Sequence, residues 1–171
     1  MKRAALMAIL VTAAVLSACG YNFRGRQNNL PSDVRSVAVP VFLNHTGEER
    51  IESIFTDEVI FQFTRSQMLR VVNEGQADAV LHGGILRVDT EDVALTADET
   101  SQQRRVKITV KAQLIRRRDG KVLWQDHRLV QRRTYQVGAS PQVTEINKQE
   151  AITNLARAMS QTLHDRVFEN F

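Results

Sequence analysis

Basic residues gather in the second half of a chain whose formal net charge is only +4. They fall on one expected strand, around the turn that ends it and on the strand that returns: Arg104, Arg105, Lys107 and Lys111, then Arg116, Arg117 and Arg118, then Arg128, Arg132 and Arg133. Guanidinium forks bind phosphate and carboxylate groups through paired hydrogen bonds. The pattern predicts a surface for an anionic partner, such as a lipid with a phosphorylated sugar head group. Two alternatives are a solvated face whose charges pair with Glu91, Asp92 or Asp126, and an acidic protein surface.

The residue types that usually carry catalysis or metal binding are sparse. The four histidines, His45, His82, His127 and His164, have no second histidine or cysteine at metal-ligand spacing. No nucleophile turn of the Gly-Xaa-Ser-Xaa-Gly type and no phosphate-binding glycine loop occurs in the sequence. The sequence therefore predicts neither a catalytic nor a metal site, and a binding protein rather than an enzyme.

Cys19 is the residue with the clearest chemistry. Met1-Lys2-Arg3 is followed by an almost wholly apolar run over 4–16 and then by Leu16-Ser17-Ala18-Cys19. An apolar run this short is typical of a removable secretion signal, since a membrane span needs roughly 20 residues. Leu-Ser-Ala-Cys resembles the lipobox, in which the thiol is diacylated and the cysteine becomes the new N-terminus. Cys19 is the only cysteine in the chain, so it cannot form an internal disulfide, and acylation explains its presence.

These features predict three segments and a location. Residues 1–18 are the signal peptide, 19–34 an acylated tether, and 35–171 a single domain, with N-palmitoyl and S-diacylglycerol groups on Cys19. Gly20 after the anchor cysteine is compatible with delivery to the outer membrane. Loss of Lys2 and Arg3 with the signal lowers the net charge from +4 to +2, which together with secretion argues against a nucleic-acid partner. Tyr21 and Phe23 in the short tether favour packing against the membrane or a membrane-embedded partner, and they could also sit at the lipid interface.

The elements that must position the basic residues follow from periodicity. Residues 36–43 are β-branched and apolar and predict a strand that is at an edge, bulged or broken at Pro40. Thr46 and Glu49 have capping-box spacing, so a helix should begin near 44–49 and run to about residue 66. Short strands are expected at 69–72 and 77–88, the second with a bulge at Gly83-Gly84, and a long loop over 89–101.

The second half has the clearest patterns. Apolar residues alternate with polar ones over 105–114, which predicts a strand with one core face and one positive face. Asp119-Gly120 predicts a hairpin turn to a strand over 122–130, and an amphipathic helix should follow Pro141 nearly to the C-terminus. The fold class is therefore α+β, a two-layer sandwich of an approximately four-stranded mixed or antiparallel sheet with two helices on one face. The other face, which carries Arg105, Lys107 and Lys111, stays open to solvent or to a partner.

An ordered set of motifs resembles one family of envelope proteins. The set runs through nearly the whole mature chain: Cys19-Gly20-Tyr21-Asn22-Phe23-Arg24-Gly25, Leu30-Pro31, Val39-Pro40-Val41-Phe42 with Asn44 and Thr46, Ile51-Glu52, Phe55-Thr56-Asp57, Ala77-Asp78-Ala79-Val80-Leu81 and Gly120-Lys121-Val122-Leu123-Trp124. It looks like the LptE family of lipopolysaccharide-assembly lipoproteins.

The resemblance implies an outer-membrane lipoprotein of the sandwich fold that plugs the β-barrel of its partner LptD, helps that barrel assemble and binds lipopolysaccharide. The family's lipopolysaccharide contacts are basic residues near strand ends and loops, which makes Arg104, Arg105, Lys107 and Lys148 the candidates here. The loop before Arg104 has no basic residue between Asp89 and Gln103, so the general location transfers better than the individual residues.

The strand over 36–43, the helix after it and Leu69-Arg70-Val71-Val72 also resemble a wider group of envelope lipoproteins. That group includes activators of penicillin-binding proteins and secretion-pore subunits. The short aromatic tether favours the plug, because an activator that reaches across the periplasm would need a long disordered linker.

Overall fold

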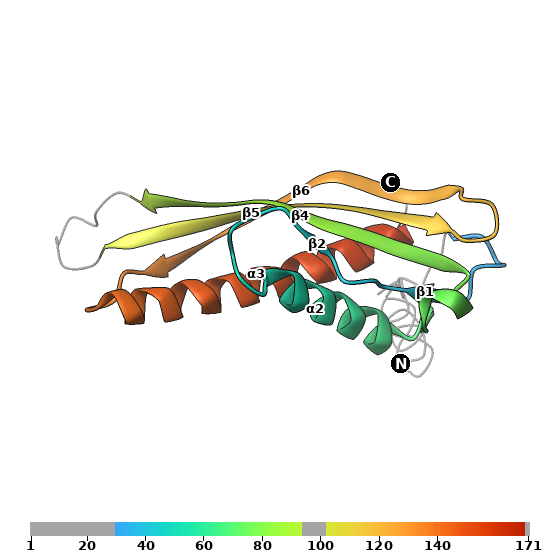
Figure 1. The fold of residues 1–171 in the computed structure, drawn as a ribbon, viewed down its shortest axis with the longest axis horizontal. Helices are drawn as coiled ribbons and strands as arrows, with labels where there is room; N and C mark the ends of the chain where they lie inside the picture. Colours follow the sequence, from blue (N-terminus) through green and yellow to red (C-terminus); the bar gives the residue numbers. More distant parts are fainter. Residues whose placement is uncertain (1–29, 94–101, 170–171) are drawn as a thin grey trace, which may run out of the picture.

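The computed structural model describes residues 30–93 and 102–169. They form a two-layer α+β sandwich, an elongated sheet with both helices on the same side of it (Figure 1). The sheet has six strands in the order β3-β1-β4-β5-β6, with β2 paired to β4. The predicted fold class is confirmed, and the sheet has six strands rather than approximately four, because the segment around Pro40 contributes two short strands and residues 70–71 contribute a third.

Three long antiparallel strands make up most of the sheet. They are β4 (Ala79–Val93), β5 (Gln103–Arg116) and β6 (Val122–Gln136). The alternation predicted for β5 is confirmed, since Val106, Ile108, Val110 and Leu114 are buried against the helices. The residues between them point to the opposite, uncovered face of the sheet.

The short strands lie where Pro40 interrupts the first apolar run. β1 (Ser36–Ala38) pairs in parallel with both β3 (Arg70–Val71) and β4, and β2 (Leu43–Asn44) pairs in parallel with β4 after the break. Of the three alternatives predicted for Pro40, an edge, a bulge or a break, the structure has the break. The 3-10 turn η1 (Glu74–Gln76) connects β3 to β4.

Helix α2 (Ile51–Ser66) packs through Ile51, Phe55, Val59 and Phe63, which recur every four residues. It begins later than predicted, and the capping-box prediction for Thr46 and Glu49 is wrong. The residue before the helix, Arg50, has a left-handed backbone (φ 62°) and makes no side-chain cap. The Thr46 hydroxyl instead accepts the amide of Glu48, within a turn closed by Asn44.

Helix α3 (Pro141–Glu169) spans the length of the sheet and confirms the predicted start at Pro141. It buries Ile152, Leu155, Met159, Leu163 and Val167, as its amphipathic pattern predicts, whereas Ile146 in its first part, also expected on the apolar face, is 65% exposed. It packs against both β6 and α2.

Two expectations for β4 are wrong. The strand continues to Val93, through the first five residues of the loop expected over 89–101. Gly83 and Gly84 are in regular register with Ala112 and Lys111, and the bulge falls at Leu86, between Ile85 and Arg87. A Cβ at Gly83 would overlap the ring of Phe42. The Phe42 ring therefore lies directly against the sheet backbone at Gly83.

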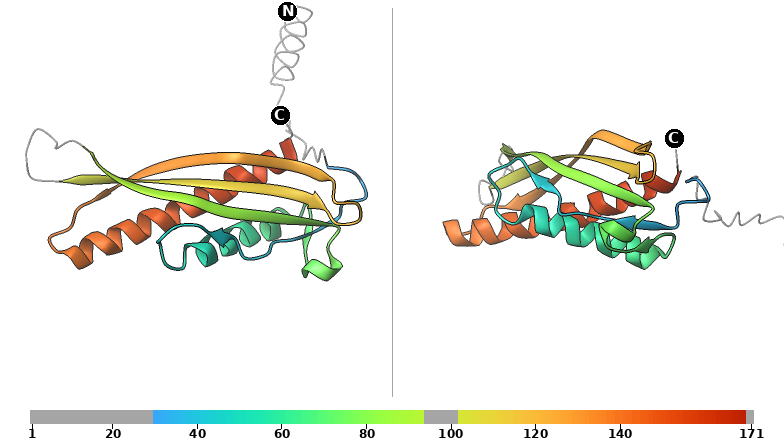
Figure 2. Two further views of the ribbon diagram at one scale, coloured as in Figure 1. Left: turned by 45° about the horizontal axis from the view of Figure 1, so that its top comes forward. Right: turned by 45° about the vertical axis from the view of Figure 1, so that its right-hand side comes forward.

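The described chain begins and ends at the same end of the long axis (Figure 2). We call this end, with residues 30–35 and the turn between β5 and β6, the tether pole. The opposite end, where β4 stops, β5 begins and α3 begins, is the distal pole.

Candidate functional site

The pleat of β5 separates the predicted anion-binding residues. Arg104 lies opposite Tyr135, which is buried, so it points to the helix side of the sheet. Arg105 and Lys107 point to the open face, as predicted. Lys148 comes from α3 on the helix side. The four residues therefore lie at the distal pole but form no single cluster.

Arg104 and Lys148 line the same pocket at the distal pole. Its volume is about 560 Å³, and its other walls include Thr90, Tyr135, the segment 137–141 that leads into α3, and one acid, Glu145. A pocket with two cations and a tyrosine has the groups needed to hold a phosphate or carboxylate. Thr90 and Tyr135 were not expected from the sequence. Residue 90 was assigned to the loop over 89–101, and Tyr135 lies beyond residue 130, where the last strand was predicted to end, whereas β6 extends to Gln136.

Three of the predicted cations form ion pairs with acids of β4. Arg104 Nε lies 2.8 Å from Asp92 Oδ1, Arg105 Nη1 lies 3.4 Å from Glu91 Oε1, and Lys107 Nζ lies 3.4 Å from Asp89 Oδ2. The structure therefore has the alternative in which basic residues of β5 pair with Glu91 and Asp92. Such exposed pairs contribute about 0–1 kcal/mol each, so an incoming phosphate could replace a carboxylate at low cost.

Lys148 is held more tightly than the other three. Its ammonium group binds the carboxylate of Glu48 and lies 4.0 Å from Glu145. Both Lys148 and Glu48 have side chains only 19% exposed. This pair joins the first part of α3 to the loop before α2, so Lys148 has a structural role whether or not it meets a ligand.

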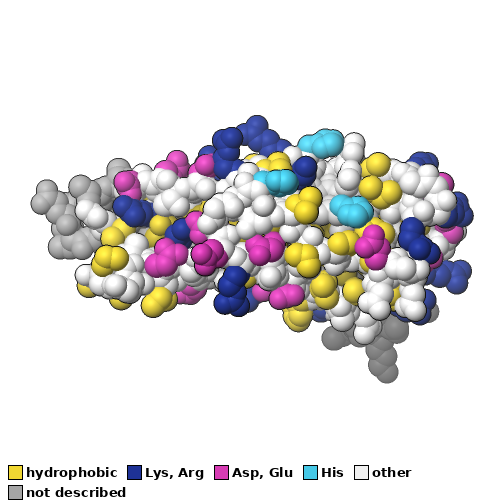
Figure 3. Space-filling model, viewed as in Figure 1, with side chains coloured by type: hydrophobic (Ala, Val, Ile, Leu, Met, Phe, Trp, Pro, Cys, Tyr) yellow, Lys and Arg dark blue, Asp and Glu magenta, His cyan; other side chains and the backbone are white. Residues whose placement is uncertain are grey.

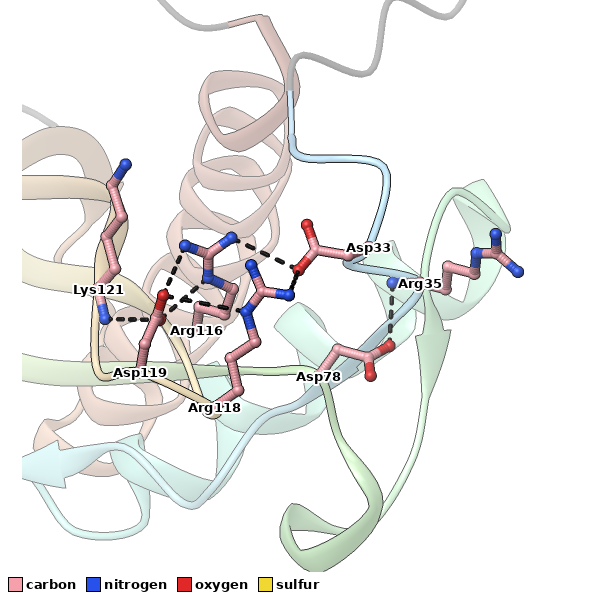
Figure 4. Close-up of polar contacts among 7 residues, drawn as sticks. All are labelled: Asp33, Arg35, Asp78, Arg116, Arg118, Asp119 and Lys121. Carbon is pink, nitrogen blue, oxygen red and sulfur yellow. Dashed lines mark hydrogen bonds and ion pairs between the residues drawn. The ribbon is translucent and has the colours of Figure 1, made fainter.

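Arg116 and Arg118 clamp the start of the described chain to the β5–β6 turn at the tether pole (Figure 4). Asp33 Oδ2 lies 3.4 Å from Arg116 Nη1 and 2.9 Å from Arg118 Nη1. Arg116 also donates two hydrogen bonds to Asp119, of 3.0 and 2.7 Å. These bonds lower the pKa of Asp119 and raise that of Arg116. Arg116 and Arg118 are therefore engaged within the fold.

Asp78 fastens the first strand to the fourth beside this clamp. Its carboxylate accepts the Ser36 hydroxyl at 2.7 Å and the Arg35 amide at 3.0 Å. The Ser36 hydroxyl in turn accepts the Asp78 amide at 3.0 Å. The hydrogen bond from Ser36 and then that from Arg35 lower the pKa of Asp78. Together with the Asp33 clamp, these contacts fix the direction in which the chain enters the domain.

The lipidation residue predicted from the sequence, Cys19, lies outside the described residues. Within residues 30–93 and 102–169, no group of His, Cys, Asp or Glu side chains is arranged to hold a metal ion. In the same residues neither helix is long and apolar enough to cross a membrane.

The described residues thus form a small α+β domain with cations on the open sheet face and around one distal pocket. The family model for LptE, described as lipopolysaccharide-assembly, matches residues 34–167. The chain therefore belongs to the LptE family. A comparison with curated proteins finds no match.

Solved structures share the fold at low identity. A putative lipoprotein from Caulobacter crescentus is 11% identical, with a TM-score of 0.52, over 74% of this chain and 87% of that one. A minor lipoprotein from Acinetobacter baumannii is 15% identical, with a TM-score of 0.52, over 78% and 91%. Protein XCC0632 from Xanthomonas campestris is 12% identical, with a TM-score of 0.51, over 79% and 86%. These likenesses support the α+β fold.

Proposed function

We propose that the chain is an outer-membrane lipoprotein that plugs an LptD-like β-barrel, helps it assemble, and binds lipopolysaccharide on its way to the outer leaflet. The match of the LptE family model to residues 34–167 carries this proposal. The role is one of binding and scaffolding rather than of catalysis, and its only covalent group is the lipid on Cys19.

The surface of the domain suits the interior of a barrel. The lumen of a transmembrane barrel is lined by polar side chains, so a plug must present a polar, charged surface rather than an apolar one. The open face of the sheet meets this requirement, since Arg105, Lys107 and Lys111 all lie on it. The elongated shape in Figure 1 also suits insertion along a barrel axis.

The barrel role predicts that full-length lipoprotein, tagged at its C-terminus and extracted from outer membranes in mild detergent, co-purifies with a β-barrel protein in near-equal amounts. Depletion of the lipoprotein should lower the level of that barrel, because the barrel would lose a partner needed for assembly. Quantitative mass spectrometry of both preparations measures the two effects. Stable recovery of the lipoprotein alone, or with a cell-wall synthase, contradicts the proposal.

Lipopolysaccharide binding predicts a second result. Reversal of three charges in Arg104→Glu/Arg105→Glu/Lys107→Glu should weaken binding about tenfold at low salt, because each reversal turns attraction for a phosphate into repulsion. The difference should shrink at high salt, where exposed charges are screened. Binding of purified lipopolysaccharide to the soluble domain measures it. An Arg65→Glu/Arg157→Glu/Arg166→Glu variant, with its charges on the helices, is the control. Equal binding by both variants would remove the distal pole from the proposed site.

A further inference from the structure

Four cations on the open face have no acidic partner among the described residues. We call them the open-face cations: Arg87, Lys111, Arg128 and Arg132. The register brings them close together, because Lys111 lies opposite Gly84 of β4, Arg87 opposite Thr109, and Arg132 opposite Lys107. Arg128 is exposed at the irregularity in β6 beside Lys111. The cations therefore span all three long strands.

The acids of this face lie elsewhere. Asp89 and Glu91 are nearer the distal pole and already pair with Lys107 and Arg105. Figure 3 shows Lys, Arg and His side chains together above the middle of the sheet, with acidic side chains to their left. Lys107 and Arg132 are direct cross-strand neighbours of like charge; Lys107 has Asp89 as its counterion, whereas Arg132 has none among the described residues, and like charges directly opposite destabilise a sheet. The unbalanced charge indicates that a partner supplies the missing anions.

The side chains around the cations indicate what kind of partner fits. Leu43 of β2 shares a row with Gly84 on this face and is 61% exposed, and Val130 of β6 is 39% exposed. His82 and Gln113, paired across β4 and β5, are exposed and polar. Arginines mixed with apolar and neutral polar side chains are typical of a protein–protein interface, where arginine is enriched.

The size of the face also favours a protein. β5 has 14 residues, which extend about 46 Å at roughly 3.3 Å per residue, and three strands are about 14 Å wide. Their product is roughly 650 Å², near the 800 Å² that each partner buries in a standard protein interface. A single lipid head group would cover only a part of it.

We propose that the open face of β4, β5 and β6 docks on a carboxylate-lined protein wall, with Arg87, Lys111, Arg128 and Arg132 as its ionic contacts. This inference rests on the proposed function and deepens it, since the wall is the inner surface of the barrel. Arg105 and Lys107 pair with Glu91 and Asp89 nearer the distal pole of the same face and are not among these contacts. The distal pocket with Arg104 lies on the other side of the sheet and stays free for lipopolysaccharide.

The test reverses two of these charges in the full-length lipoprotein, as Arg87→Glu/Arg132→Glu. The matched control is Arg65→Glu/Arg133→Glu, which makes the same charge change on α2 and on the helix side of β6. We expect the yield of co-purified barrel to fall at least tenfold for the first pair and less than twofold for the control. Thermal unfolding of the soluble domains should be similar or higher for Arg87→Glu/Arg132→Glu, because that variant relieves repulsion within the face.

A photocrosslinking amino acid at Val130 gives an independent readout in cells. It should form a crosslink between the lipoprotein and the barrel protein. The same amino acid at Phe61 on α2 tests whether the helix layer contacts the barrel instead. Equal barrel yields for the two double variants, or crosslinks from Phe61 but not Val130, overturn the open-face assignment and leave the plug intact. A Val130 adduct with glycolipid in place of protein also overturns it. Absence of the barrel from the wild-type preparation refutes both the plug and this inference.

Discussion

Replacing Gly83 by alanine should lower the free energy of unfolding by about 3 kcal/mol, at the upper end of the range for overpacking a core. Gly83 is paired within the sheet, and a Cβ there would overlap the ring of Phe42. Phe42 is 1% exposed, and its amide is held by Thr56 Oγ1 of α2 at 3.0 Å. The ring therefore cannot move away without disturbing both layers. Urea unfolding followed by circular dichroism measures the loss.

The neighbouring glycine supplies the control for this experiment. A Cβ at Gly84 would face the open side, where the nearest atom is Lys111 Cε at 3.3 Å. That atom is near the end of a flexible side chain, so Gly84→Ala should change the stability by less than about 1 kcal/mol. A Phe42→Leu substitution should recover part of the stability of Gly83→Ala, because it removes the overlapping ring atoms. Equal costs at the two glycines would contradict the packing described for Phe42.

Substitution of Cys19 by alanine should abolish membrane attachment. The proposed anchor is acyl chains on this thiol, and each buried methylene contributes about 0.8 kcal/mol to membrane binding, so loss of the thiol removes the whole anchor. We expect the variant to incorporate no labelled palmitate and to fail to appear as mature lipoprotein in outer-membrane fractions. Metabolic labelling and cell fractionation measure both effects.

The neighbouring serine provides a control for the anchor experiment. Ser17→Ala exchanges one small residue for another two positions before the cysteine and should leave labelling intact. Palmitate incorporation into the Cys19→Ala protein would show that acylation takes place at another position.

Strand β5 and the two helices could be predicted because each has one face buried along most of its length. In β5, Val106 through Leu114 alternate between a buried core and an open face, and in α3 the buried positions recur at helical spacing. Burial of one face makes apolar residues recur at the period of the helix or strand. The prediction failed for the second half of β4. There Asp89, Glu91 and Asp92 pair with cations of β5, so the residues do not alternate between apolar and polar as they do in a strand with one buried face.

The candidate site was only partly predictable for a related reason. The presence of a cationic surface follows from the clustering of basic residues along the sequence, and the opposite directions of Arg104 and Arg105 follow from the pleat. Which cations are paired depends on the register between β4 and β5. That register shifts at the bulge between Ile85 and Arg87, which the sequence places wrongly at the glycines. Arg87 was therefore overlooked, although it carries one of the unpaired charges.

The length of α3 determines how far the domain can reach from its anchor. Its 29 residues extend about 43 Å at 1.5 Å per residue, and they run between the distal pole and the tether pole. The hydrocarbon core of a bilayer is about 30 Å thick. A domain standing upright on its lipid inside a barrel would therefore carry the Arg104 pocket past the depth of the membrane, to the level of the opposite leaflet. The length of α3 would then set the distance between the lipid anchor on one side of the membrane and the Arg104 pocket on the other.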